Sequence, residues 1–234
     1  MKKIAIISAH PDDETLGAGG TLLKHKERGD SILWIIVTDV HASNGFSQER
    51  VDSRHQEVKE VSNQMGFDKT IQLDYPTMSL SGESLITLIP KISKAFLDFE
   101  PEVVYCVNRS DAHSDHRIVF DAVMACTKSF RYPFIKQILM YECISETEFA
   151  PALSEKIFIP NYFVDITEYL NIKLEVMKVF ESELEEHPFP RSLDNITALA
   201  HFRGASIGVK YAEAFQLLKF IDKLVYVLVI LLVI

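Results

Sequence analysis

A mostly polar hexapeptide near the N-terminus carries the residues best suited to chemistry. It reads Ala9-His10-Pro11-Asp12-Asp13-Glu14 and closely follows the apolar run Ile4–Ile7. At the end of a buried strand, one imidazole and three carboxylates would stand at the carboxyl edge of a sheet, where open α/β folds bind their ligands. Imidazole and carboxylate groups are common metal ligands. His10 and Asp13 are therefore candidate ligands, and a carboxylate beside them is free to act as a base.

A third ligand must come from elsewhere in the chain. The segment Asp111-Ala112-His113-Ser114-Asp115-His116 follows the apolar run Val103–Val107 and offers two histidines three residues apart. Because the carboxyl ends of parallel strands share one edge of a sheet, the two polar segments are expected to face the same point. Two histidines and one carboxylate, with a fourth position left for water, are typical of a catalytic zinc site. Zinc is the default metal, and ferrous iron suits the same ligands.

The elements that must position these residues alternate between strand and helix. Strands are predicted at residues 3–8, 31–38, 70–73, 103–107, 137–143 and 156–159. Helices are predicted at residues 15–28, 49–65, 83–99, 116–127, 167–185, 196–203 and 209–222. The continuous apolar runs are typical of parallel strands covered on both faces. The order predicts an α/β fold: a Rossmann-like, mostly parallel sheet with helices on both faces and a mainly helical C-terminal elaboration.

Size and composition favour one domain and a small substrate. The chain has 234 residues, of which 47% are hydrophobic, and we predict a single domain over residues 1–223. A net charge of -9 without a Lys/Arg cluster argues against a nucleic acid or an anionic membrane as partner. Whether the chain forms a homo-oligomer stays open.

The cysteines and the chain ends bear on location. Cys106, Cys126 and Cys143 are expected to be buried free thiols in a reducing compartment. The N-terminal apolar run is too short for a signal-peptide core, so the cytoplasm is the expected location. Residues 224–234 are apolar without a break. Since a bilayer span needs about 20 residues, we expect a packed or exposed tail of unknown role rather than a membrane span.

The two polar segments together resemble the two motifs of the LmbE/PIG-L family of metal-dependent deacetylases. The matching stretches are His10–Glu14 and His113–His116, each after a predicted strand. Residues 54–66 resemble the family's Arg/Glu helix, and residues 203–215 resemble its C-terminal stretch. The resemblance implies a zinc-dependent hydrolase that removes the N-acetyl group from an N-acetylglucosamine-type sugar or glycoconjugate and releases acetate.

The resemblance also implies a role for each matching residue. The implied metal ligands are His10, Asp13 and His116. Asp12 is implied as the general base toward the metal-bound water, and after accepting a proton it could serve as the acid at the leaving amine. His113 is implied as the group that stabilises the oxyanion, and we expect it to be protonated beside Asp111 or Asp115.

Four further residues are candidates for substrate contact: Arg54, Glu14, Asp39 and His41. Arg54 could hold a sugar hydroxyl or a phosphate, although an ion pair with Glu57 explains it equally well. Glu14 could contact the substrate or orient a ligand histidine. Asp39 and His41 follow the second predicted strand at the same edge of the sheet.

Two other functions stay open at this level: a non-catalytic Rossmann-like module that binds a sugar or nucleotide, and a metal-dependent hydrolase of another amide. The run Gly17–Gly20 does not match the Gly-x-Gly-x-x-Gly fingerprint of dinucleotide sites. A first loop rich in carboxylates would also repel a pyrophosphate. The sequence does not identify the carrier of the sugar.

Overall fold

A computed structural model describes residues 1–222 of the chain, and within them one sheet has the strand order β3-β2-β1-β4-β5-β7-β6. The strands are β1 (Lys3–Ser8), β2 (Ser31–Asp39), β3 (Lys69–Pro76), β4 (Val103–Val107), β5 (Gln137–Tyr141), β6 (Tyr162–Asp165) and β7 (Ala212–Phe220). The first five strands pair in parallel, and β7 runs antiparallel to both β5 and β6. The mostly parallel α/β fold is therefore confirmed.

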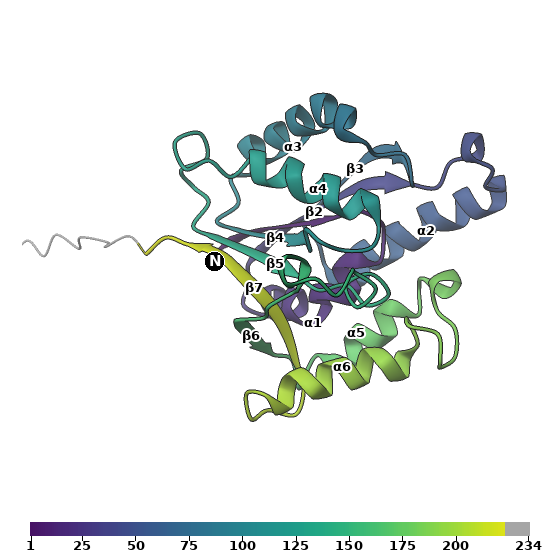
Figure 1. Cartoon of the computed structure of the whole chain (residues 1–234), viewed down its shortest axis with the longest axis vertical. Coiled ribbons are helices and arrows are strands. Elements are labelled where there is room, and N and C mark those ends of the chain that lie inside the picture. The colour runs from purple at the N-terminus through teal and green to yellow at the C-terminus, as the bar shows by residue number, and fades with distance from the viewer. Residues whose placement is uncertain (223–234) are drawn as a thin grey trace, which may run out of the picture.

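Helices cover both faces of the sheet (Figure 1). They are α1 (Asp13–Glu27), α2 (Gln48–Met65), α3 (Leu85–Phe99), α4 (Ser114–Ala125), α5 (Leu170–Met177) and α6 (Leu193–Ala205). Helices α1, α2 and α5 pack together on one face, α3 and α4 pack together on the other, and α6 lies against α5 and β7. The predicted stop of α2 is confirmed, because Gly66 caps the helix with a φ of 67° that a glycine adopts without strain.

Strand β1 occupies the centre of the parallel part of the sheet. It pairs with β2 on one side and β4 on the other, so that Ile7 aligns with Ile35 and with Cys106. The chain leaves β1 toward α1 on one face and leaves β4 toward α4 on the other. Such a change of face between neighbouring parallel strands opens a crevice at their carboxyl ends. The two polar loops of interest begin at this crevice.

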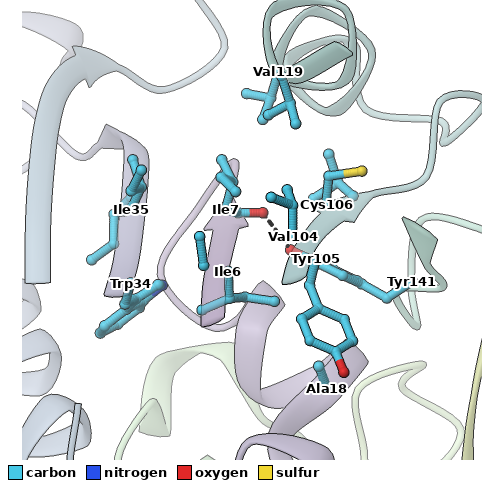
Figure 2. Packing of buried hydrophobic residues seen from close by; sticks show 14 of the residues in the cluster. Ile6, Ile7, Ala18, Trp34, Ile35, Val104, Tyr105, Cys106, Val119 and Tyr141 are labelled. Carbon is cyan, nitrogen blue, oxygen red and sulfur yellow. Dashed lines mark hydrogen bonds between the residues drawn. The ribbon is translucent and has the colours of Figure 1, made fainter. Parts of the chain in front are cut away.

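The core lies on both faces of the central strands (Figure 2). Ile7 points to the side of Val119 on α4, whereas Ile6 points to the opposite side, where Ala18 of α1 lies. All four side chains are fully buried. Tyr141 of β5 reaches beneath β4 and donates its hydroxyl hydrogen bond to the Ile7 carbonyl oxygen at 2.9 Å, which ties β5 to the centre of the sheet.

Two glycines of the run Gly17–Gly20 allow α1 to pack tightly against the sheet. A Cβ atom at Gly17 would lie 2.2 Å from the ring of Tyr141, and one at Gly20 would lie 2.7 Å from Ile166. Only a residue without a side chain leaves room for these contacts. The first turns of α1, which follow the polar hexapeptide, are thereby held close to β5 and to the start of the C-terminal region.

Three sequence predictions in the C-terminal part are wrong. The helix predicted at residues 167–185 is shorter, because α5 ends at Met177 and a separate 3-10 turn follows at Glu181–Glu183. The strand predicted at residues 156–159 lies later, at β6, and is preceded by a short 3-10 turn over Ser154–Lys156. The helix predicted at residues 209–222 is β7, whose first residues, Ala212–Phe215, are buried between β5 and β6 and include the charged Glu213. The elaboration thus adds two strands to the sheet beside α5 and α6.

The three cysteines are buried and free, as predicted. Among residues 1–222, no helix combines the length and the apolar character that crossing a membrane requires. The predicted tail, residues 224–234, lies outside the described residues, and the single domain over residues 1–223 stays a prediction.

Candidate metal centre

The candidate ligands stand on loops that turn into helices. Asp12 immediately precedes α1 and accepts a hydrogen bond from the backbone N–H of Leu16 through its own carbonyl oxygen at 2.8 Å. His113 precedes α4 and caps it, because its Nδ1 accepts from the N–H of Asp115 at 3.1 Å. Asp13 and His116 therefore lie in the first turns of two helices whose starts face each other across the crevice between β1 and β4.

Asp13 lies between the two histidines predicted as its fellow ligands. Its Oδ1 is 3.3 Å from Nε2 of His116, and its Oδ2 is 3.8 Å from Nδ1 of His10. One candidate ligand atom from each of the three residues lies within 4.8 Å of the other two. Ligand atoms around a tetrahedral zinc ion are about 3.4 Å apart, so the three residues fit a small divalent cation.

An orphaned nitrogen gives independent support for a cation at this point. Nε2 of His116 is buried and lacks a hydrogen-bond partner among the described residues, because the nearby Asp13 oxygen is poorly oriented for one. The other ring nitrogen, Nδ1, contacts Asp111 Oδ2 at 2.8 Å. A carboxylate behind a ligand histidine fixes the ring and leaves the opposite nitrogen free for a metal. Asp111, which the sequence suggested as a partner of His113, contacts His116 instead.

A second group of three residues, His10, His113 and Asp115, is also compact enough to hold a cation. Its ligand atoms are already occupied, however. The two carboxylate oxygens of Asp115 accept from the N–H groups of Met78 at 2.8 Å and Leu80 at 3.2 Å, and the Nδ1 of His113 caps α4. Asp115 also contacts Nε2 of His10 at 3.2 Å. Asp115 is thus better placed to orient His10 than to bind a metal.

The two adjacent aspartates have opposite electrostatic surroundings. Burial raises the pKa of Asp12 well above its ordinary value, and the neighbouring carboxylates Asp13 and Glu183 raise it further. Burial acts in the same direction on Asp13, yet the charges of His116 and His10 and the hydrogen bond from the N–H of His10 hold the pKa of Asp13 well below its usual range. Asp13 is therefore suited to stay an ionised ligand, whereas Asp12 is suited to exchange a proton.

The protonated state expected for His113 is wrong for this geometry. Burial lowers the pKa of His113 to about 4, with a further contribution from the nearby His10. The neutral ring accepts at Nδ1 from the N–H of Asp115, so its proton is on Nε2. A neutral imidazole of this kind still offers one N–H donor.

A pocket of about 340 Å³ opens at this centre, and the predicted ligands, Asp12 and His113 all line it. Of the four candidates for substrate contact, Asp39 and Arg54 line the pocket, although both are almost fully buried. His41 and Glu14 do not line it. His41 lies 3.0 Å from Asp74, and Glu14 is completely buried beneath the first loop.

Further pocket residues come from segments that the sequence did not single out. Cys143, Ser145 and Glu146 follow β5, and Glu183 and Arg191 come from the segment between α5 and α6. The first three could have been found, because their loop leaves a parallel strand at the same edge of the sheet. Glu183 could not, because the apolar spacing predicted a helix through residue 185.

Residues 5–127 match the family model of PIG-L, described as GlcNAc-PI de-N-acetylase. The chain belongs to the PIG-L family. The matched residues contain both polar loops, so the resemblance on the two motifs is confirmed.

Relatives of this PIG-L family chain include two deacetylases. An uncharacterized deacetylase, YaiS of Escherichia coli K12, is 29% identical over 186 residues, which are 77% of this chain and 91% of the relative. The diacetylchitobiose deacetylase of Thermococcus kodakarensis is 26% identical over 233 residues, which are 92% of this chain and 83% of the relative.

Solved structures share the fold. The N,N'-diacetylchitobiose deacetylase of Pyrococcus horikoshii superposes with a TM-score of 0.73 at 23% identity, over 93% of this chain and 84% of that one. GalB of Pseudomonas putida, a 4-carboxy-2-hydroxymuconate hydratase, superposes with a TM-score of 0.70 at 18% identity, over 96% of this chain and 100% of that one. Because a deacetylase and a hydratase share this fold, the function must be argued from the site.

Proposed function

We propose that this chain is a metal-dependent deacetylase that hydrolyses the N-acetyl group of an N-acetylglucosamine-type sugar. The observation that carries the proposal is the orphaned Nε2 of His116 beside Asp13 and His10, at the wall of a pocket that Asp12 also lines. Membership of the PIG-L family and the diacetylchitobiose deacetylases among the relatives support an N-acetylated sugar as the substrate. The carrier of that sugar is left open.

In this proposal His10, Asp13 and His116 hold one divalent cation, with zinc as the default and ferrous iron as the alternative. Bound there, the cation would polarise the acetyl carbonyl and lower the pKa of a coordinated water toward about 7. Asp111 and Asp115 fix the rings of His116 and His10 from behind.

The protein residues then handle the protons and the developing charge. Asp12 takes a proton from water as the water oxygen attacks the carbonyl carbon. Burial and the neighbouring carboxylates, which raise the pKa of Asp12, stabilise its protonated form. The Nε2–H of His113 donates a hydrogen bond to the carbonyl oxygen as that oxygen becomes negative. When the carbon–nitrogen bond breaks, Asp12 returns the proton to the amine nitrogen, and acetate and the free amino sugar result.

The remaining properties of the chain agree with a small substrate. The net charge of -9 disfavours nucleic acid as partner. The three buried free cysteines support a reducing compartment, in line with the cytoplasm.

An acetate-release assay tests the proposal. The protein is stripped of metal, reconstituted with zinc or with ferrous iron under anaerobic conditions, and incubated with N,N'-diacetylchitobiose, N-acetylglucosamine and an N-acetylated amino acid. We expect acetate and free amine in equal amounts from the sugars, loss of activity with a chelator, and about one metal ion per chain. Full activity of the metal-free protein would contradict the metal site. Sugar binding without acetate would indicate a binding module, and activity on the amino acid alone would indicate a hydrolase of another amide.

A further inference from the structure

The peptide bond between Pro11 and Asp12 is held at both ends by hydrogen bonds to the buried side chains of Arg54 and Glu14. Nη1 of Arg54 donates to the carbonyl oxygen of Pro11 at 2.9 Å, and Oε2 of Glu14 accepts from the N–H of Asp12 at 3.2 Å. Arg54 comes from α2 and Glu14 from the first turn of α1. Both residues are buried, with 3% and 0% of their surface exposed. The orientation of this peptide plane is therefore fixed from two elements.

The conformation held in this way is one that a residue with a side chain avoids. Asp12 has a φ of 122° and a ψ of -31°. Positive φ values bring the Cβ atom close to the backbone, and outside glycine they persist only where the surroundings impose them. The carbonyl oxygen of Asp12 is also fixed, since it accepts from the N–H of Leu16. Both peptide planes beside Asp12 are thus restrained.

Glu14 has no capacity left for a substrate. Besides the N–H of Asp12, its carboxylate accepts from the hydroxyl of Ser8 at 3.2 Å and from the hydroxyl of Thr15 at 2.7 Å. It does not line the pocket.

Arg54 is similarly committed, although its side chain reaches the wall of the pocket. Its Nε lies 3.0 Å from a carboxylate oxygen of Glu57, and its Nη2 donates to Glu183. With Nη1 on the Pro11 oxygen, both terminal nitrogens donate hydrogen bonds, while Nε forms an ion pair with Glu57 without a hydrogen bond.

We propose that Arg54 and Glu14 are positioning residues that clamp the Pro11–Asp12 peptide and so aim the Asp12 carboxylate at the metal centre. The inference rests on the proposed function for the role of Asp12, and it replaces substrate contact as the role of both residues. A clamp of this kind acts on the proton-exchanging group. Its loss should therefore lower kcat and leave KM little changed, because substrate binding is not touched.

Steady-state kinetics on an N-acetylated sugar tests the clamp. The variants are Arg54→Met, Glu14→Leu, the double variant, and Glu14→Gln, whose amide oxygen can accept the same N–H. We expect each of the first two to lower kcat about 10-fold or more, with KM within about threefold and metal content unchanged. Glu14→Gln should retain kcat within about threefold.

The double variant carries the decisive comparison. Because both side chains act on one peptide bond, the second substitution should lower kcat by no more than about threefold beyond the first. Lys59→Met, on an exposed position of α2, is the matched control and should behave like the wild type. A raised KM with unchanged kcat in Arg54→Met, or a double variant whose loss equals the product of the single losses, would overturn the clamp.

A second measurement needs neither metal nor substrate. In metal-free protein, Asp12→Gly should have a higher Tm than Asp12→Ala, because glycine adopts the positive φ without strain. If the clamp imposes this conformation, the difference in Tm should shrink by at least about half when Arg54→Met is added. An equal difference in both backgrounds would contradict the clamp.

The Tm comparison also separates the two proposals. A wild-type protein that releases no acetate would refute the proposed function, while the Tm values would still decide on the clamp. Should Arg54→Met fail to fold, Arg54→Lys takes its place, since lysine keeps the charge between Glu57 and Glu183 but lacks the planar fork of arginine.

Discussion

At the scale of single residues, Asp12 and Asp13 show how neighbours in sequence acquire different chemistry. Asp13 lies beside two histidines that favour its ionised form. Asp12 is buried near two carboxylates, and both the burial and the carboxylates disfavour the ionised form of Asp12. The separation follows from the turn at Asp12, which sends the two side chains in different directions as α1 begins. One carboxylate is thereby suited to bind a cation and the next to exchange a proton.

Substitution of the proposed base should separate catalysis from metal binding. Asp12→Asn keeps the size of the side chain and tolerates a positive φ better than most residues, but it cannot take up a proton. We expect kcat for acetate release to fall on the order of 10²–10⁴-fold, with an unchanged metal content measured by elemental analysis. Asp121→Asn, on an exposed position of α4, is the control. Equal rates for Asp12→Asn and the wild type would exclude Asp12 as the base.

The two histidines of the second loop should respond differently to truncation. His116→Ala removes the orphaned nitrogen and should abolish metal retention during dialysis against a weak chelator. His113→Ala should retain the metal and lose on the order of 10²–10³-fold in kcat, because it removes one oxyanion donor. Metal loss in His113→Ala with retention in His116→Ala would instead favour the group formed by His10, His113 and Asp115.

The sequence predicted the convergence of the three candidate ligands better than the contacts of the residues around them. His10, Asp13 and His116 could be found because ligand types and spacing after two strands are local features of the sequence. The partners of Arg54 could not, because Glu183 is far from it in sequence and meets it only after folding. Glu14 was placed near the substrate by its position in the motif, and its burial depends on how α1 packs.

At the scale of elements, a buried ion pair joins α1 to the C-terminal region. The Nζ of Lys173 on α5 lies 2.7 Å from Glu213 on β7 and also donates to the carbonyl oxygen of Leu16 at 2.8 Å. Glu213 accepts from the backbone N–H groups of Gly20 and Thr21 at 2.9 and 2.8 Å. The pair thus forms hydrogen bonds with backbone groups of α1 close to Gly17 and Gly20, where the helix packs tightly against its neighbours.

Removal of one partner of this pair should be costly. Glu213→Gln leaves the buried ammonium of Lys173 without its countercharge and should lower the free energy of unfolding by about 3–5 kcal/mol, measured by denaturant titration. The double variant Lys173→Met with Glu213→Leu should recover much of that loss, because no charge stays buried. Glu175→Gln, which breaks an exposed ion pair with Lys178 on the solvent side, should cause no measurable change. Similar losses for the buried and the exposed pair would contradict this account.

The same ion pair explains why β7 was predicted as a helix. A charged residue such as Glu213 within a short apolar run argues against a buried strand unless its partner is known, and Lys173 lies on a different element. The predicted strands at residues 3–8 and 103–107 have no buried charged residue and match β1 and β4 in full. Strand pairing among the five parallel strands follows local patterns, whereas the two added strands depend on tertiary contacts.

At the scale of the whole molecule, a largely buried histidine, His25, lies among polar and charged groups at the edge of the sheet opposite the pocket. At the opposite edge, near the amino end of β2, His25 contacts Asp30 through Nδ1 at 2.8 Å and the hydroxyl of Tyr105 through Nε2 at 2.9 Å. Burial lowers the pKa of His25, and the charges of Arg28 and Lys2 add to this effect against the opposing charge of Asp30. Protonation of this imidazole is therefore less favourable in the folded protein than in the unfolded chain.

The lowered pKa of His25 gives the stability of the molecule a defined dependence on pH. Below about pH 6.5 the unfolded chain binds a proton at His25 more readily than the folded protein does, so the free energy of unfolding falls as the pH decreases. The loss from this residue is at most about 1.4 kcal/mol per pH unit and ends at the lowered pKa of the folded state.

His25→Gln removes the titrating group, and its Tm should fall less than that of the wild type between pH 7.5 and pH 5.5. His201→Gln, on an exposed position of α6, should keep the wild-type decrease. An equal decrease in His25→Gln would show that other groups govern the acid sensitivity of the fold.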